Sequence, residues 1–223
     1  MCVVGEPTSQ RAPGDTIKIG RCGRMCGTVR VRGVQGHGAY PDRADNHLAR
    51  LIRFLSHLGE TPLDHGSLHF APSSVSITSI DGSNAATHVT PGQAQACFDV
   101  RFNDCHTRAS LESRLRRLAA AQLHETHELE LRCDAEPFLC APGRWHEALA
   151  HAAYAVVGRR PEFSTSGETS DARFIHPYCP VVELGLVGTP VHRADEHVSL
   201  ADLDSLTAIY TLMLAGFVRV AAH

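Results

Sequence analysis

Carboxylate and imidazole side chains that could hold a metal ion stand near both ends of this chain. Near the start, VGEPTS places Glu6 directly after a short apolar run that predicts a strand. Open α/β sheets bind ligands beyond the carboxyl ends of their strands, so Glu6 is a candidate metal ligand. The alternative is an ordinary solvated glutamate at a strand end.

Near the end, VHRADEHVS contains His192 and His197, and imidazole is a frequent zinc ligand. Asp195 and Glu196 could orient or charge-balance such a site. A structural histidine near a helix start is the alternative. Glu6 and one histidine would supply two ligands, whereas a zinc ion normally takes at least three protein groups plus water. The predicted ligand set is therefore incomplete.

A third histidine has little bulk around it. GVQGHGAYP sets His37 between Gly36 and Gly38, directly after a predicted strand, where a substrate could approach it. The plainer interpretation is a turn histidine stabilised by these two glycines.

Four stretches in one order, VGEPTS, GVQGHGAYP, SGETSDARF and VHRADEHVS, resemble motifs of the dinuclear zinc aminoacylases and carboxypeptidases. The resemblance runs from Cys2 to the final helix. It implies that Glu6 and His192, rather than His197, bind zinc, in a site of two zinc ions that cobalt could also fill. It also implies that the other ligands and the general base lie upstream of VGEPTS, outside this chain. His37 would cross a dimer interface and donate a hydrogen bond to the oxyanion in the partner's active site.

The resemblance also implies which residues bind substrate. Arg21 and Arg101 would bind substrate carboxylates, for which a guanidinium fork is suited. Thr169 would contact the bound acyl amino acid, and Tyr40 would line the site. The alternatives are surface ion pairs of small energetic value for the arginines and a packing role for Tyr40.

Three residues depart from the family's pattern and put the substrate in question. His88, at a substrate-binding position, replaces an asparagine, and Glu168 and Ala172 replace glycines. A glycine can occupy backbone conformations closed to other residues. An added carboxylate would also disfavour a dicarboxylate ligand unless it is paired.

The residues between Met25 and Cys133 predict a self-contained unit. Alternating, β-branched runs predict strands at 25–34, 74–80, 94–102 and 127–133. Helical spacing predicts helices over 44–58 and from Thr107. The first helix should bury one apolar face: Leu48, Leu51, Ile52, Leu55 and Leu58. This βαββαβ order predicts a ferredoxin-like unit with helices on an antiparallel sheet.

The flanking segments predict an α/β fold. CVVGEP predicts a short buried strand, PEFSTS and PVVELGL two more, and residues 145–157 a helix. The last helix should begin at Ser199, with a capping box closed by Asp202. Its expected buried stripe is Leu203, Leu206, Tyr210, Met213 and Phe217.

The predicted architecture is part of a zinc-peptidase-like catalytic domain interrupted by a dimerisation, or lid, domain. The catalytic domain takes residues 1–22 and 136–223, and the inserted domain takes 23–135. Too few strands lie outside the insertion to complete a parallel sheet with both faces covered.

Composition favours small-molecule chemistry in the cytoplasm. The net charge is −3 with both signs interspersed, so no basic stripe indicates nucleic acid or an anionic membrane surface. No membrane span or signal peptide is predicted, and the eight cysteines form no CxxC pair. Three functions stay open: a homodimeric hydrolase of an N-acyl amino acid with further carboxylates, a hydrolase of acetylornithine or another N-acyl amino acid, and a noncatalytic dimerisation fragment.

Overall fold

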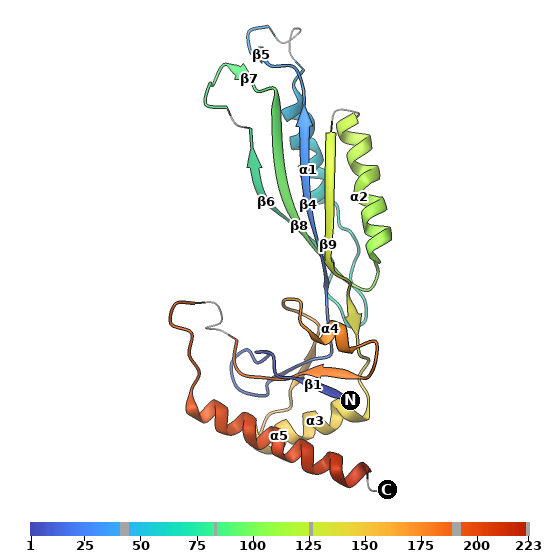
Figure 1. The fold of residues 1–223 in the computed structure, drawn as a ribbon, viewed down its shortest axis with the longest axis vertical. Coiled ribbons are helices and arrows are strands. Elements are labelled where there is room, and N and C mark those ends of the chain that lie inside the picture. The colour runs from blue at the N-terminus through green and yellow to red at the C-terminus, as the bar shows by residue number, and fades with distance from the viewer. Residues whose placement is uncertain (41–44, 83, 125–126, 189–192, 222–223) are drawn as a thin grey trace. The chain divides into compact units, whose positions relative to one another are not determined.

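The computed structural model describes residues 1–40, 45–82, 84–124, 127–188 and 193–221, with side chains as far as residue 216 (Figure 1). The chain forms two compact units. One contains residues 1–21 and 138–223, and the other contains residues 22–137, inserted between them.

The inserted unit is an antiparallel sheet in the order β6-β8-β4-β9, covered on one face by two helices (Figure 1). The strands are Ser74–Asp81, Gln93–Phe102, Gly23–Arg32 and His127–Ala135. Buried residues alternate with more exposed ones along β4 and β8, as in a sheet with one solvated face. The helices α1 (His47–Glu60) and α2 (Arg108–Leu123) provide the other side of the core. The predicted βαββαβ order is confirmed.

Aromatic rings fill the core of this unit. Phe54, Phe98 and Phe102 are at most 2% exposed. The prediction that α1 buries Ile52 was wrong, because Ile52 is 59% exposed and Phe54 points inward. Leu51 and Phe54 are three residues apart and share a helix face, whereas Ile52 lies about 100° around the helix from Leu51.

The unit built from the two chain ends has a mixed sheet in the order β1-β12-β2-β11. Its strands are Cys2–Val4, Val181–Glu183, Thr16–Lys18 and Glu162–Ser164. β12 and β2 are antiparallel, and the other two pairs are parallel. Three of these strands were predicted, although β1 is half-buried rather than buried, and β2 was not predicted. The short strands β3 (Gly20–Arg21) and β10 (Phe138–Leu139) pair beside this sheet.

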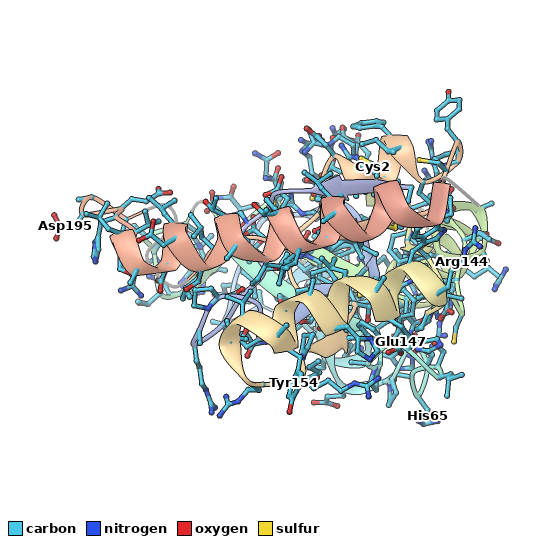
Figure 2. All side chains as sticks on the ribbon, turned by 90° about the horizontal axis from the view of Figure 1, so that it is seen from below. Cys2, His65, Arg144, Glu147, Tyr154 and Asp195 are labelled. Atoms are coloured by element: carbon cyan, nitrogen blue, oxygen red, sulfur yellow. The ribbon has the colours of Figure 1, made fainter. Side chains whose placement is uncertain are left out.

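Two helices, α3 (Arg144–Val157) and α5 (Leu200–Ala221), lie side by side in this unit (Figure 2). Ser199 Oγ accepts a hydrogen bond from Asp202 N at 3.0 Å, which confirms the predicted helix start. The buried stripe differs from the prediction, because Ile209 is fully buried and Leu203 is 39% exposed. The side chain of Phe217 lies outside the described residues. None of the described helices combines the length and the apolar character needed to cross a membrane.

Candidate functional site

A hollow of about 620 Å³ in the unit made from the chain ends brings three predicted site residues together. Glu6 follows β1, Arg21 ends β3, and Thr169 lies in the loop after β11. Lys18 and Glu168 also line this hollow, so its walls carry both cations and carboxylates. The mixed sheet thus gathers polar groups from segments that are far apart in sequence.

The loop that carries Glu6 is held against the end of β12. Gly185 N donates to Thr8 Oγ1 at 3.0 Å, and Ser9 Oγ donates to Gly185 O at 2.7 Å. A Cβ on Gly185 would lie 2.2 Å from the carbonyl oxygen of Glu6, so only glycine permits this approach. The fixed loop holds Glu6, half-buried, on the wall of the hollow.

Arg21 forms a buried ion pair with Glu183 at the end of β12. Its Nε donates to Glu183 Oε2 at 2.9 Å, and Nη2 contacts the same oxygen. The side chains of the pair are 8% and 2% exposed, so the interpretation of Arg21 as a surface ion-pair residue was wrong. Arg21 Nη1 also donates to Ser166 O at 3.1 Å, and Ser170 Oγ donates to Glu183 Oε1. Carboxylate binding by Arg21 stays a prediction.

The loop after β11 needs a glycine at position 167, next to the substituted position 168. Gly167 has φ +102°, and a Cβ there would lie 2.5 Å from Arg21 Nη1. Among the described residues, His124 is the only non-glycine with positive φ, so neither Glu168 nor Ala172 requires a glycine conformation. Ala172 is fully buried at the start of α4 (Ala172–Ile175). The substitutions therefore change the loop's charge more than its backbone.

Lys18 is a buried cation on the same wall that sequence reasoning missed. Its side chain comes from β2, the residue is 5% exposed, and Nζ donates to Ser164 Oγ at 3.0 Å and Ser166 Oγ at 2.8 Å. Burial, reinforced by the nearby Arg21 guanidinium, lowers the pKa of Lys18 to about 8. A lysine inside the apolar strand TIKIG was the signal that could have identified it.

In the inserted unit, His37, Tyr40 and His88 lie close together. The pairing of β5 (Gly36–His37) with β7 (Val89–Thr90) sets the ring centroids of His37 and His88 5.0 Å apart, and Tyr40 is 6.0 Å from His37. Ala39 N donates to His37 Nδ1 at 3.1 Å. In a neutral imidazole this assigns the proton to Nε2, so an exposed His37 presents an N–H donor to groups outside the unit.

Arg101 lies on the solvated face of the inserted sheet, in an ion pair. Its Nε donates to Asp99 Oδ2 at 3.1 Å, while Asp99 Oδ1 accepts from Arg24 Nε at 2.8 Å on the neighbouring strand. Burial opposes ionisation of Asp99, but the two arginines lower its pKa overall. This arrangement agrees with the ion-pair interpretation of Arg101 and leaves substrate binding by Arg101 a prediction.

The predicted metal ligands cannot be compared as a pair, because His192 lies outside the described residues. Its rival His197 is exposed and contacts Asp195 O through Nδ1. In the described ranges, no group of three or more His, Cys, Asp or Glu residues could hold a metal ion. Since zinc normally takes three or more protein ligands, the described donors do not form a zinc site by themselves.

A second hollow, of about 290 Å³, runs along α3 and contains no predicted site residue. Figure 2 shows Glu147 and Tyr154 of its lining on the side of α3 away from α5. Glu147 forms an ion pair with Arg160 there at 2.7 Å, and both side chains are well exposed. We therefore take the hollow at Glu6 as the candidate site.

The comparisons match both the inserted unit and the chain as a whole. Residues 19–127 match the family model of the peptidase dimerisation domain. The chain is 50% identical over 213 residues to a succinyl-diaminopimelate desuccinylase of Rhodospirillum centenum, covering 96% of this chain and 55% of the relative. It is 49% identical over 219 residues to the enzyme of that name from Rhodopseudomonas palustris, covering 97% and 57%. The chain thus spans little more than half of these relatives' length.

Solved structures show the same architecture at low identity. An aminopeptidase PepT from Bacillus cereus matches with a TM-score of 0.75 at 17% identity, covering 95% of this chain and 55% of that chain. Human carnosine dipeptidase 1 matches with a TM-score of 0.63 at 18% identity, covering 95% and 57%. These matches confirm the predicted fold, an α/β domain interrupted by a peptidase dimerisation domain.

Proposed function

Because the chain is homologous to part of the succinyl-diaminopimelate desuccinylases, we propose that it forms the C-terminal part of an enzyme of that activity. The reaction is hydrolysis of N-succinyl-LL-2,6-diaminopimelate to succinate and LL-2,6-diaminopimelate, a step of lysine biosynthesis in the cytoplasm. Water adds to the amide carbon, the C–N bond breaks, and the departing nitrogen takes a proton.

The observation that carries this proposal is the convergence of Glu6, Arg21 and Thr169 on one hollow. The substrate has carboxylates at both ends, and guanidinium N–H groups suit carboxylates. Glu183 and the carbonyl of Ser166 hold the Arg21 guanidinium in a fixed orientation, which is what a substrate-positioning residue requires. Thr169, in the adjacent loop, would contact the acyl amino acid.

His37 would act on the reaction in a partner subunit. Its exposed Nε2–H could donate a hydrogen bond to the oxyanion that forms when water attacks the amide. Hydrogen-bond donors placed where negative charge develops lower the activation barrier by about 3–4 kcal/mol. Tyr40 and His88 would flank it, and Arg101 would bind a further carboxylate once released from Asp99.

The homodimer that this role requires would form through β6. One edge of the inserted sheet, β9, alternates the charged residues Glu128, Glu130 and Arg132, which discourage strand pairing. The opposite edge, β6, has no Lys or Arg and exposes Ile77 by 41% and Ile80 by 59%. β6 is therefore the edge suited to pair with a second copy.

The complete enzyme would be zinc-dependent, with cobalt as a substitute. Glu6 and His192 would be ligands, and the rest would come from the part of the relatives' length that this chain does not span. The bound metal would supply an activated water and polarise the amide carbonyl.

The test is to join the chain to the segment of the Rhodospirillum centenum relative that it does not cover, and to assay succinate release. We expect metal-dependent hydrolysis of N-succinyl-diaminopimelate that a chelator abolishes and zinc or cobalt restores. Hydrolysis of acetylornithine alone would favour the alternative function, an acetylornithine or other N-acyl amino acid hydrolase. Glu168 and His88, which depart from the family's pattern, support that alternative. If the fusion folds with zinc and hydrolyses neither, the noncatalytic dimerisation module replaces the proposal.

A further inference from the structure

Lys18 is the only lysine of this chain, and the other 20 of its 21 basic residues are arginines. It is also 5% exposed, on the wall of the hollow at Glu6. Arginine and lysine are not interchangeable, because an ammonium is a compact point charge with three donors whereas a guanidinium is a planar fork. The single lysine thus places a compact, buried positive charge on the wall of the hollow.

The direct hydrogen-bond partners of Lys18 are uncharged. Nζ donates to the hydroxyls of Ser164 and Ser166, which accounts for two of its three N–H groups. The buried carboxylate of Glu183 is bound by Arg21 and Ser170 instead. In the described part of the chain, Lys18 forms no ion pair.

A buried ammonium with only hydroxyl partners is costly, and an anion beside it would offset that cost. Burial and Arg21 lower the pKa of Lys18, while the more distant carboxylates of Glu183, Glu162 and Asp15 only partly oppose them. Two carboxylates on the same walls, Glu6 and Glu168, would repel a doubly charged phosphate more strongly than a carboxylate.

We infer that Lys18 is the carboxylate anchor of this hollow: its third N–H binds a ligand carboxylate, and Ser164 and Ser166 hold the ammonium in place. The inference rests on the proposed function only for the identity of that carboxylate, which would be the succinyl end of the substrate. Arg21, held in a fixed orientation by Glu183, lines the same hollow and would meet the ligand's other carboxylate.

The single lysine allows a direct test on the 223-residue chain. With ¹³C,¹⁵N-labelled lysine, NMR should show one side-chain signal. Succinate should shift it and raise its titration midpoint above about 8, because an anion favours the charged form. Succinamide, the neutral analogue, should leave it unchanged. Succinate binding should weaken as the pH rises through that midpoint.

A variant that retains Lys18 also retains its NMR signal, so ligand binding can still be measured. Ser166→Ala should weaken succinate binding about fivefold, as expected for one lost hydrogen bond. Ser205→Ala, half-buried on α5 and not part of the lining of the hollow, is the matched control and should have no effect.

Three results would overturn the inference. The first is a signal that does not respond to succinate, and the second is an equal response to phosphate, which would indicate a general anion site. The third is a midpoint near 10.4, about that of an exposed lysine, which would show that the ammonium is not buried. If succinate binds at Lys18 but the fusion enzyme does not hydrolyse the substrate, this inference holds and the proposed function is wrong. If the fusion enzyme hydrolyses the substrate but succinate does not bind at Lys18, the proposed function holds and this inference is wrong.

Discussion

Glu183 sets the electrostatics of the hollow, because its buried carboxylate holds Arg21 and balances one of the two cations there. Breaking a buried ion pair from one side leaves the other charge unpaired in a poorly solvated place, which is more costly than losing the attraction itself. Glu183 is the last residue of β12, so we expect the loss of its ion pair to destabilise the sheet that contains this strand.

We therefore expect Glu183→Gln to lower the free energy of unfolding of this unit by about 3–5 kcal/mol. The single tryptophan, Trp145 on α3, reports on the same unit, so urea denaturation followed by its fluorescence measures the change. Glu162→Gln removes an exposed carboxylate from β11 of the same sheet and should change stability by less than about 0.5 kcal/mol. Equal effects of the two substitutions would contradict the role given to the ion pair.

Glu168 places a carboxylate at the rim of the same hollow, where the related family has a glycine. Removing that charge with Glu168→Gln should tighten succinate binding about two- to threefold, a small effect because the side chain is exposed. The gain should shrink in 0.5 M salt, which screens exposed charges. Calorimetric titration measures it, with Glu147→Gln on α3 as control. Weaker binding would mean that Glu168 contacts the ligand favourably.

The motifs predicted only part of this site. Glu6, Arg21 and Thr169 stand in recognisable stretches, and the structure brings them to one hollow. Lys18 and Glu183 belong to no motif and lie in apolar strands, where sequence patterns predict burial but not the partner that a buried charge finds. That partner is set by strand order, and β2 was not predicted.

Between α1 and β6, the loop is fixed by one carboxylate. Asp64 Oδ1 accepts hydrogen bonds from Gly66 N at 2.7 Å, Ser73 N at 3.1 Å and Asn103 Nδ2 at 2.6 Å. Burial alone would raise the pKa of Asp64, but the bonds from Ser73, Gly66 and Asn103 lower it to about 2. The loop is thereby tied to the end of β8.

A lowered pKa means that the folded state favours the ionised carboxylate. This contribution is fully present above the ordinary aspartate value of about 4 and is lost as the pH falls through about 2. Asp64→Asn should therefore destabilise the inserted unit by about 2 kcal/mol at pH 7, and its difference from the native chain should vanish near pH 2. NMR signals of β8 amides followed in urea measure this. Asp104→Asn, exposed nearby, is the control, and a pH-independent difference at Asp64 would refute the linkage.

Long elements were predictable and short ones were not. Ten-residue β4 and β8 alternate over their whole length, and α1 repeats its apolar residues over 14 residues, so periodicity identifies them. β2 and β5 have three and two residues, too few to show a period. They form strands because segments distant in sequence pair with them, and no local sequence pattern predicts such pairing.

For the whole molecule, the proposed function predicts a dimer, because it gives the exposed His37 a role in the active site of a partner subunit. The adjoining helix α1 also exposes an apolar side chain, that of Ile52, by 59%. An edge strand and a neighbouring helix together offer backbone hydrogen bonds and apolar area to an identical copy, which is how two-fold symmetric interfaces form.

Ile80→Lys should therefore convert the dimer into a monomer, because a charge on an edge strand opposes pairing with the same edge of a second copy. Sedimentation velocity over a range of concentrations measures the change, and we expect the apparent dissociation constant to rise at least about 100-fold, equivalent to about 2.7 kcal/mol. Leu68→Lys alters a side chain that is 91% exposed in the loop before β6 and should leave the dimer intact. A dimer that survives Ile80→Lys would contradict the assignment of the interface to the β6 edge.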